Sequence, residues 1–523
     1  QIASRRPPAL KAIMPIAGTD NRFTDDAHYV GGLLGLPNLD WGILMKSVMA
    51  GPPDPSIVGD AWEAMWQARL DATPSIIARW VQHQRFDSYW QRGAAALNYG
   101  AIQCPTYIVA GWLDTYSNPV GRLLKYIDVP KKALIGPWTH TYPEVATPIG
   151  VDWQYEEVRW WYHWLLGEET GIMAEPMLWA FMPYSTAPEY RPEPVPGRWI
   201  AETQWPSDTI TSKKLWLSES GLTEVGPSNE KYTFKSDIPI GRSKPEWLDR
   251  LPGEQSPDDK HSLVFDSEPL QEDLEIFGYP QVHLRIAADK PVASLTVRLT
   301  DVLSERQSWL VSYVIRNLTH RDTHIAPSLL EPGQFYNISL PLFMTAHRFK
   351  TGHRIRIAIS DGLWPMTCPI LDAATLTIDT VSSFVELPVR PVEAEPQALP
   401  FDAIVRSNNG KAFEVHLMEA DESGRYHYQR QTPEYSYAER EVGTILSTTN
   451  SKYCELLPNS ESIWRHHIRQ GWQRGDWHCA IEADIEVAAS INSFRVKESL
   501  YAYKSGERFF EKTTDEEIER NML

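Results

Sequence analysis

Two polar residues that can cooperate in proton transfer follow two successive strand-like segments. Asp114 lies in GWLDTYSN, directly after the β-branched run TYIVA, and His140 lies in GPWTHTYP, directly after KKALI. If these runs are neighbouring parallel strands, both loops lie at the edge of the sheet where ligands bind in such folds. An aspartate that accepts a hydrogen bond from one imidazole nitrogen fixes the tautomer, and the other nitrogen can then take a proton from a hydroxyl. The pair is therefore a candidate orienting acid and general base.

Neither residue is informative by itself, because a histidine after a strand is usually structural and an aspartate in a strand–helix loop usually caps the helix. The order of the pair adds information, since an Asp on one strand-end loop and a His on a later one is the α/β-hydrolase order, in which the nucleophilic Ser precedes both. The 523 residues contain no G-x-S-x-G. The opening QIASRRPPALKAI reads as the end of a helix, a proline stop and the next strand, as expected after a nucleophile elbow. We therefore expect a Ser about two helical turns before Gln1, in a longer protein of which this chain is a fragment.

The elements that must hold this pair alternate in type over the first part of the chain. TYIVAGWLD and KKALIGPWTH read as strands, PVGRLLKYI and EEVRWWYHWLLG as helices, and LKAIMPIAG as a further short strand. Between residues 41 and 103, bulky apolar side chains recur at helical spacing in WEAMWQARL and SIIARWVQHQRFDSYW. The alternation predicts a parallel sheet built from βαβ units, with the helical stretch over one end of the sheet.

Strand-like segments dominate the remainder. Apolar and polar residues alternate, with turn residues between the segments, in KLWLSES, HSLVFDS, PQVHLRIAA, ASLTVRLTDV, WLVSYVIRNL, FYNISLPL and RIRIAISD. This pattern predicts an antiparallel sandwich of jelly-roll type. The Pro-rich stretches EYRPEPVPGRW and ELPVRPVEAEPQALP mark its boundaries. EVHLMEA, CAIEADIEV and SFRVKESLYAY are again strand-like, and they form either a separate β module or an extension of the sandwich.

The predicted fold class is thus α/β followed by β. It comprises a partial α/β-hydrolase sheet with a helical cap, then a jelly-roll β-sandwich, then a β-rich C-terminal extension. The expected domains are 1–205, with the cap at about 35–103, then 206–390 and 391–523. A chain of this length has room for these units, since domains commonly hold about 100–200 residues.

Charge and cysteine usage exclude several classes of function. The formal net charge is −18, and a negative field repels nucleic acid and anionic membrane surfaces. No apolar run reaches about 18 residues, so no segment is predicted to span a bilayer. The cysteines form no C-x-x-C and are predicted to be buried free thiols in a reducing compartment, the cytoplasm; they are Cys104, Cys368, Cys454 and Cys479. Export stays open as an alternative, because the expected N-terminus lies before Gln1.

Several motifs make the sequence similar to the CocE/NonD family of α/β-hydrolases, relatives of X-Pro dipeptidyl-peptidases. QIASRRPPALKAI resembles the segment after the family's G-x-S-x-G-G elbow, and HYVGGLLGLPNLDW resembles the entry to its cap. AGWLDTYSN resembles its acid loop and LIGPWTHTYP resembles its histidine loop. RWWYHWLLGEETGI resembles the helix that follows the histidine loop. SLVFDSEPLQEDLEIFGYPQVHLRIAADKPVASLTVRLTDV and FKTGHRIRIAISDGLWP resemble its jelly roll. The resemblance runs from about residue 1 to residue 385 and is weaker beyond residue 400.

This resemblance implies a serine hydrolase that cleaves an ester or amide bond through an acyl-enzyme, without metal or cofactor. It implies that Asp114 is the triad acid and His140 the general base. Tyr116, Trp41 and His28 match positions that line the family's acyl pocket, although His28 stands where the family can have Trp. The nucleophilic Ser and the Tyr expected to help form the oxyanion hole are not in the sequence, so the fragment alone is expected to be inactive.

Two further functions stay open at this point. An X-Pro dipeptidyl-peptidase needs an anion to hold the substrate's N-terminal ammonium, and the sequence does not single one out. A non-catalytic β-sandwich binding protein on a decayed hydrolase is the other alternative. The expected partner is a small ester, amide or peptide substrate, with no nucleic acid and no membrane, and a homo-oligomer is left open.

Two pairs of histidines are candidate metal ligands. His347 and His353 flank FKTG, and His466 and His467 lie in IWRHHIRQGW, which we interpret as helical. Neither pair has Cys or carboxylate residues at metal-ligand spacing, so no metal site is predicted.

Overall fold

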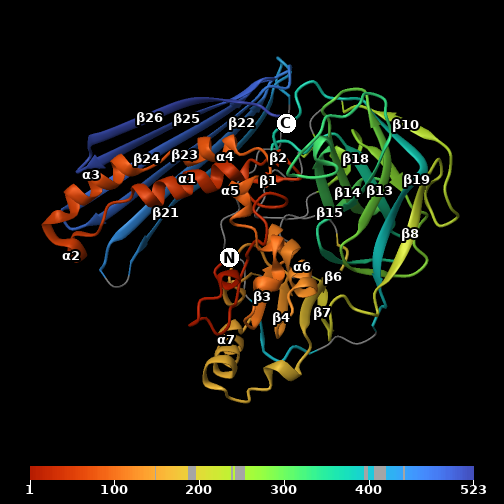
Figure 1. Cartoon of the computed structure of the whole chain (residues 1–523), viewed down its shortest axis with the longest axis horizontal. Helices are drawn as coiled ribbons and strands as arrows, with labels where there is room; N and C mark the ends of the chain where they lie inside the picture. Colours follow the sequence, from red (N-terminus) through yellow and green to blue (C-terminus); the bar gives the residue numbers. More distant parts are fainter. Residues whose placement is uncertain are drawn as a thin grey trace.

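The computed structural model of the chain comprises an α/β part, a two-layer β-sandwich and a separate antiparallel sheet (Figure 1). The predicted order of an α/β part followed by β-rich parts is confirmed at this level. The structure describes residues 1–147, 149–186, 196–236, 240–241, 254–393, 398–405, 420–439 and 442–522. Part of each predicted Pro-rich linker, 187–195 and 394–397, lies outside the described residues.

The α/β part has a four-stranded sheet in the order β3 (Thr106–Gly111), β4 (Lys131–Gly136), β6 (Leu178–Pro183) and β7 (Gly197–Glu202). The first three strands are parallel, and β7 is antiparallel to β6. Residues 13–17 pair with the other edge of β3 through main-chain hydrogen bonds. Helices follow the first two strands, α6 (Asn118–Tyr126) after β3 and α7 (Trp153–Trp161) after β4. β3 is buried along its whole length, as expected of a central parallel strand that is covered on both faces.

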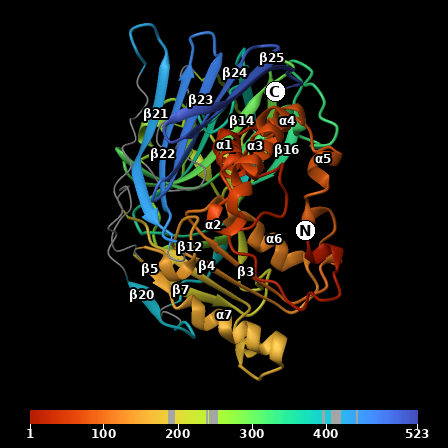
Figure 2. The same cartoon turned by 90° about the vertical axis from the view of Figure 1, so that its left-hand side faces the viewer.

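The cap helices lie along one face of the C-terminal sheet (Figures 1 and 2). The cap contains β1 (Tyr29–Val30), β2 (Leu33–Leu34), α1 (Pro37–Ala50), α2 (Pro55–Val58), α3 (Trp62–Ala72), α4 (Ile76–Gln82) and α5 (Ser88–Gln91). The sheet is an antiparallel meander of β21 (Tyr426–Ala438), β22 (Ile445–Leu456), β23 (Ser462–Arg474), β24 (Trp477–Ala489), β25 (Ser493–Lys504) and β26 (Glu507–Glu519). The C-terminal extension is therefore a sheet of its own.

The cap and the C-terminal sheet share one hydrophobic core. Helical side chains such as Leu39, Ile43 and Trp66 pack in the same cluster as strand residues such as Trp464 and Ile485. Burial alternates along β24 and β25, because successive strand residues point to opposite faces and only one face meets the helices. Neither half could bury its apolar face without the other.

Polar contacts join the same two parts at the rim of this core. Lys46 of α1 forms a buried ion pair with Glu498 of β25, at 2.5 Å between Nζ and Oε2. The hydroxyl of Ser75 donates to the other oxygen of Glu498 at 2.6 Å. Arg474 and Asp54 form a second ion pair at 2.5 Å. These contacts hold the sheet in a defined position against the cap helices.

The sandwich consists of two antiparallel sheets that enclose a second core. One sheet has the order β16 (Tyr336–Pro341), β13 (Gln281–Ala288), β19 (Leu376–Arg390), β12 (Leu274–Gly278) and β17 (Thr345–Phe349). Two further strands, β8 (Thr211–Ser218) and β10 (Lys231–Phe234), also pair with β19, and β9 (Gly221–Thr223) pairs with β8. The other has the order β11 (Leu263–Asp266), β18 (Arg354–Ser360), β14 (Ser294–Ser304) and β15 (Gln307–Asn317). The remaining elements are α8 (Ser256–Asp259) and the pair β5 (Ile149–Val151) and β20 (Ala403–Val405).

All four cysteines are buried and none of them forms a disulfide, which confirms that part of the sequence prediction. Cys454 and Cys479 lie on β22 and β24, whereas Cys104 and Cys368 lie in loops, and all four serve as small buried side chains. Among the described helices, none has the length and apolar character needed to cross a membrane.

A buried cluster of basic side chains lies between the cap and the sandwich, and we expect it to make the folded protein less stable at acid pH. Nδ1 of His320 lies 3.0 Å from Nδ1 of His324, whose Nε2 lies 2.5 Å from Nη1 of Arg316. Burial, and then Arg316, lower the pKa of His320 to about 4, and the same causes lower the pKa of His324. Because the folded pKa of His320 lies below its unfolded value of 6.5, its stabilising contribution is complete above pH 6.5 and is lost as the pH falls towards 4. We expect a loss of about 3 kcal/mol over this window.

Urea denaturation at pH 7.5 and pH 4.5 measures this effect. The variant His320→Asn should show a smaller loss of unfolding free energy on acidification than the unmodified protein does. The exposed His478→Asn is the matched control and should keep the original pH dependence. An unchanged pH slope in His320→Asn would show that other groups cause the acid lability.

Candidate active site

The loops after β3 and β4 run side by side because two glycines allow a close approach. β3 and β4 pair in register from Thr106 opposite Lys131 to Gly111 opposite Gly136. A Cβ on Gly111 would meet the carbonyl oxygen of Trp138 at 2.0 Å, and one on Gly136 would meet the Trp138 ring at 1.8 Å. Beyond the strands, the N–H of Leu113 still donates to the carbonyl of Trp138 at 3.0 Å. The two loops therefore reach the sheet edge together, as the sequence order predicted for parallel strands.

Asp114 and His140 meet at this edge. Oδ2 of Asp114 lies 2.8 Å from Nδ1 of His140. Oδ1 of Asp114 accepts from the N–H of Tyr116 at 3.1 Å, so the carboxylate also caps the short helix that follows. The carboxylate is fully buried, whereas 43% of the His140 side chain is exposed. The arrangement suits an acid that orients a histidine whose ring faces an accessible space.

That space is a cavity of about 630 Å³ between the α/β part, the cap and the C-terminal sheet. Its lining includes all of the sequence-predicted residues that were expected to touch substrate, namely His28, Trp41, Tyr116 and His140. Trp41 is 40% exposed, which is a large fraction for a tryptophan and fits a side chain that faces an open cavity. The volume is within the range of pockets that hold small organic ligands.

Tyr116 and Asp26 form a polar wall beside the histidine. The Tyr116 hydroxyl donates to Oδ1 of Asp26 at 2.7 Å, and its ring centroid lies 5.5 Å from that of His140. Burial raises the pKa of Asp26, and burial together with the Asp26 charge raises the pKa of Tyr116. The tyrosine is therefore a neutral hydrogen-bonding group in this site at physiological pH.

His28 lies deeper, between two tryptophans. Its ring centroid lies 4.3 Å from that of Trp80 and 5.0 Å from that of Trp90. Burial, and then the charge of Arg22, lower the pKa of His28 to about 3. His28 is thus an uncharged aromatic wall of the cavity at neutral pH.

Two comparisons with protein families cover most of the chain. Residues 1–142 match the X-Pro dipeptidyl-peptidase (S15) family, and residues 170–399 match the X-Pro dipeptidyl-peptidase C-terminal non-catalytic domain. A CocE/NonD hydrolase from Staphylococcus aureus has the same fold, with a TM-score of 0.56, 14% identity, and coverage of 74% of this chain and 69% of that one. The chain belongs to the CocE/NonD family.

Individual relatives of this CocE/NonD chain differ in their reported activities. A cocaine esterase of Rhodococcus sp. (strain MB1 Bresler) is 23% identical over 335 residues, which are 56% of this chain and 54% of the esterase. A Xaa-Pro dipeptidyl-peptidase of Ligilactobacillus salivarius is 20% identical over 350 residues, 58% of this chain and 42% of the peptidase. An α-amino acid ester hydrolase structure has a TM-score of 0.57 at 20% identity, with 74% of each chain covered. The chain spans about half the length of the curated relatives it matches.

The C-terminal sheet, which neither family match includes, supplies a wall of the cavity that the sequence analysis missed. Arg430, Lys452 and His466 stand opposite one another on β21, β22 and β23, and Asn450 stands opposite Ile468 in the next row. All of these residues line the cavity, as does Thr432. We call Arg430, Lys452 and His466 the cross-strand row. The sequence offers one local sign of this row, which is that the cavity-lining residues within each strand lie two positions apart.

Asp40 of α1 binds the cross-strand row to the cap. Its carboxylate lies 2.6 Å from Nζ of Lys452 and 2.9 Å from Nδ1 of His466. Burial alone would raise the pKa of Asp40, but Lys452 and His466 reverse this effect and hold the pKa well below its usual value. An ionised Asp40 is needed here because like charges on adjacent strands repel.

The histidines that were candidate metal ligands contact other protein side chains. The helical prediction for IWRHHIRQGW is wrong, because the segment belongs to β23. Trp464, His466 and Ile468 are buried on one face of that strand, and pairing with β22 and β24 overrides the helical pattern. In the sandwich, His347 and His353 both contact the Asp301 carboxylate, at 2.8 and 2.9 Å.

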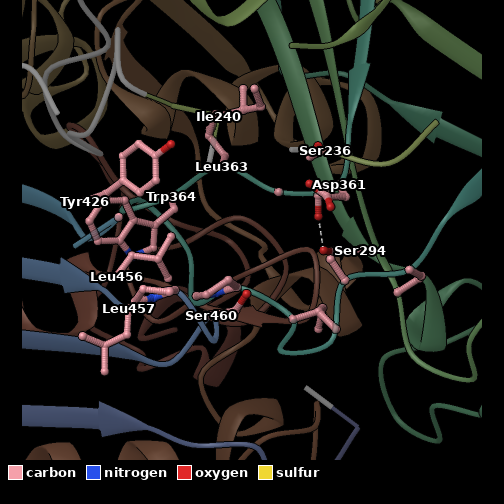
Figure 3. A pocket seen from close by; sticks show the side chains of 18 residues that line it. Ser236, Ile240, Ser294, Asp361, Leu363, Trp364, Tyr426, Leu456, Leu457 and Ser460 are labelled. Atoms are coloured by element: carbon pink, nitrogen blue, oxygen red, sulfur yellow. Dashed lines mark hydrogen bonds between the residues drawn. The ribbon is translucent and has the colours of Figure 1, made fainter. Parts of the chain in front are cut away.

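A second cavity of about 340 Å³ lies between the sandwich and the C-terminal sheet (Figure 3). Ser236, Ser294 and Asp361 lie on one side of it, and Tyr426 and Leu456 on the other. The Ser294 hydroxyl donates to the main-chain oxygen of Asp361. Its described lining includes no histidine, so these serines have no base beside them. Of these two cavities, the His140 cavity is the one whose described lining holds a histidine oriented by a carboxylate.

Proposed function

We propose that the protein is a serine hydrolase that cleaves an ester or amide bond through an acyl-enzyme at the His140 cavity. The observation that carries the proposal is the contact between the buried Asp114 carboxylate and Nδ1 of the cavity-lining His140. A base of this kind activates a hydroxyl nucleophile, and the family's esterases and peptidases share this class of chemistry.

In the proposed mechanism, Asp114 keeps the proton on Nδ1 of His140. Nε2 then accepts the proton of the attacking serine and later returns it to the leaving group. Tyr116, Trp41 and His28 surround the acyl group. The proposal places the serine outside these 523 residues, because they contain no G-x-S-x-G and span only part of the relatives' length. Backbone N–H groups beside that serine are expected to stabilise the oxyanion.

An X-Pro dipeptidyl-peptidase stays the alternative to an esterase or acylase. A peptidase of that kind needs a carboxylate available to the substrate's ammonium. Of the two carboxylates in the described lining, Asp40 contacts Lys452 and His466. Asp26 accepts from the hydroxyl of Tyr116 and the N–H of Ala27 at Oδ1, and its buried Oδ2 has no hydrogen-bond partner among the described residues. Asp26 is therefore the group that could serve the peptidase alternative.

Fluorophosphonate labelling of the full-length gene product, followed by peptide mapping, tests the proposal. We expect one labelled serine, with labelling lost in His140→Ala because the general base is gone. The half-buried His163→Ala, on the helix that follows the histidine loop, is the matched control and should label normally. Absence of labelling in the folded full-length protein would contradict the proposal and favour a binding role on a decayed hydrolase.

A further inference from the structure

The charge around the candidate active site is opposite in sign to that of the whole chain. A shallower cavity of about 340 Å³ adjoins the first one, and both include Arg22, His28 and Trp41 in their linings. Two carboxylates line the two cavities together, against five Lys and Arg side chains: Arg5, Arg22, Arg92, Arg430 and Lys452. The whole chain has 68 Asp and Glu against 50 Lys and Arg. Cations concentrated in a cleft raise the local concentration of anions despite a negative net charge.

Arg22 stands where the two cavities meet, and it is half-buried. Among the described residues, its guanidinium has no hydrogen bond and no carboxylate oxygen within ion-pair distance. Of the three aspartates nearby in sequence, Asp20 and Asp25 form ion pairs with Arg122 instead. The third, Asp26, interacts with Arg22 electrostatically but forms no hydrogen bond or ion pair with it. The planar guanidinium can therefore still bind a ligand carboxylate with two parallel hydrogen bonds.

The cross-strand row strengthens the field at the opposite wall. Asp40 contacts both Lys452 and His466, so a single carboxylate serves two basic side chains, and Arg430 stands opposite Lys452 on the next strand. On the α/β side, Asp26 is hydrogen-bonded to Tyr116 and Ala27. The positive groups thus lie on both sides of the space that His140 faces.

We propose that the substrate of the His140 site carries a carboxylate, and that Arg22 binds this group where the two cavities meet. The inference rests on the proposed hydrolase function for the identity of the reacting bond. It adds that the ester or amide is anionic. The carboxylate belongs either to the acyl part or to the leaving group, and the two sources can be separated by experiment.

A binding experiment tests the carboxylate site without requiring turnover. The probes are monomethyl glutarate, which has one carboxylate, and dimethyl glutarate, which has none, and every binding measurement uses full-length protein that carries His140→Ala, so that neither ester is hydrolysed. Quenching of tryptophan fluorescence reports occupancy, because Trp41, Trp80 and Trp90 line the cavities. We expect the full-length protein to bind the monoester at least about tenfold more tightly, with an affinity that falls as salt is added.

The variant Arg22→Gln should abolish this preference, whereas the exposed Arg306→Gln on the sandwich should retain it. Equal affinity for the two esters, or a preference that survives Arg22→Gln, would overturn the inference. A circular dichroism melting curve that matches the unmodified protein would show that Arg22→Gln is folded.

A kinetic experiment with the full-length protein identifies which part of the substrate is charged. The substrates are the 4-nitrophenyl monoester of glutaric acid, 3-carboxy-4-nitrophenyl butyrate, and the neutral 4-nitrophenyl butyrate. We expect one charged ester to exceed the neutral one in kcat/KM by about 10- to 100-fold, and Arg22→Gln to remove that ratio. A higher kcat/KM for the neutral ester than for both charged esters would overturn the inference. If no ester is cleaved while the binding preference persists, the proposed hydrolysis fails and the carboxylate site stands.

Discussion

In the full-length protein, Asp114→Asn is expected to lower kcat/KM for ester hydrolysis by about 10⁴-fold while leaving the fold intact. The asparagine oxygen can still accept from the N–H of Tyr116, which preserves the cap. Its amide then faces Nδ1 of His140 and donates to it, so the ring takes the tautomer with the proton on Nε2. A protonated Nε2 cannot accept the proton of a serine. Steady-state kinetics with a chromogenic ester and the rate of fluorophosphonate labelling measure the effect.

The exposed Asp60→Asn in the cap is the control for this substitution and should be within about twofold of the unmodified rate. Thermal denaturation should give similar midpoints for both variants, since Asp and Asn have nearly the same shape. More than a tenth of the original activity in Asp114→Asn, with an unchanged midpoint, would mean that His140 does not depend on Asp114 for its tautomer.

The second large effect is expected at the ion pair between the cap and the C-terminal sheet. Lys46→Met should lower the free energy of unfolding by about 3–5 kcal/mol, because it leaves the Glu498 carboxylate buried with the Ser75 hydroxyl as its one remaining partner among the described residues. Urea denaturation followed by tryptophan fluorescence measures this loss. Since the same interface positions the cross-strand row, the variant should also weaken substrate binding more than it lowers kcat.

The double variant Lys46→Met/Glu498→Leu distinguishes a lost ion pair from a packing defect. Replacing both charges by apolar side chains of similar size should recover most of the stability, because the desolvation cost of the charges also disappears. Lys504→Met is the matched control, since Lys504 pairs with Glu63 across the same interface, with both side chains about half exposed. That surface pair should contribute less than about 1 kcal/mol. A loss in Lys504→Met equal to that in Lys46→Met would refute the role of burial.

The meeting of Asp114 and His140 could be predicted from the sequence because it depends on local order alone. Each residue directly follows an apolar run, and one helix connects the runs, so a parallel sheet must bring the two loops to one edge. The close approach also has a local signature, in the glycines Gly111 and Gly136 that end the two strands. The assignment of His28, Trp41 and Tyr116 to the pocket came from family resemblance, and their catalytic or binding roles stay predictions.

The wall formed by the C-terminal sheet could not be predicted in the same way. Arg430, Lys452 and His466 become neighbours only through the register of three strands, and that register depends on pairing along the whole meander. Their approach to Asp40 depends further on a core shared between segments roughly 400 residues apart in sequence. No periodicity in a single segment contains that information. The segment around His466 even favours a helix when it is read alone.

The shared core of the cap and the C-terminal sheet has a consequence for how the protein is made. The helix α5 ends at Gln91, but the last strand that completes this core ends at Glu519. At roughly 5–20 residues per second, the ribosome finishes β26 on the order of 20–90 s after the cap helices have emerged. During that interval the apolar faces of α1, α3 and α4 lack the C-terminal sheet, which supplies much of their native core. The newly made cap therefore depends on chaperones or on transient contacts with the rest of the nascent chain until β26 has emerged.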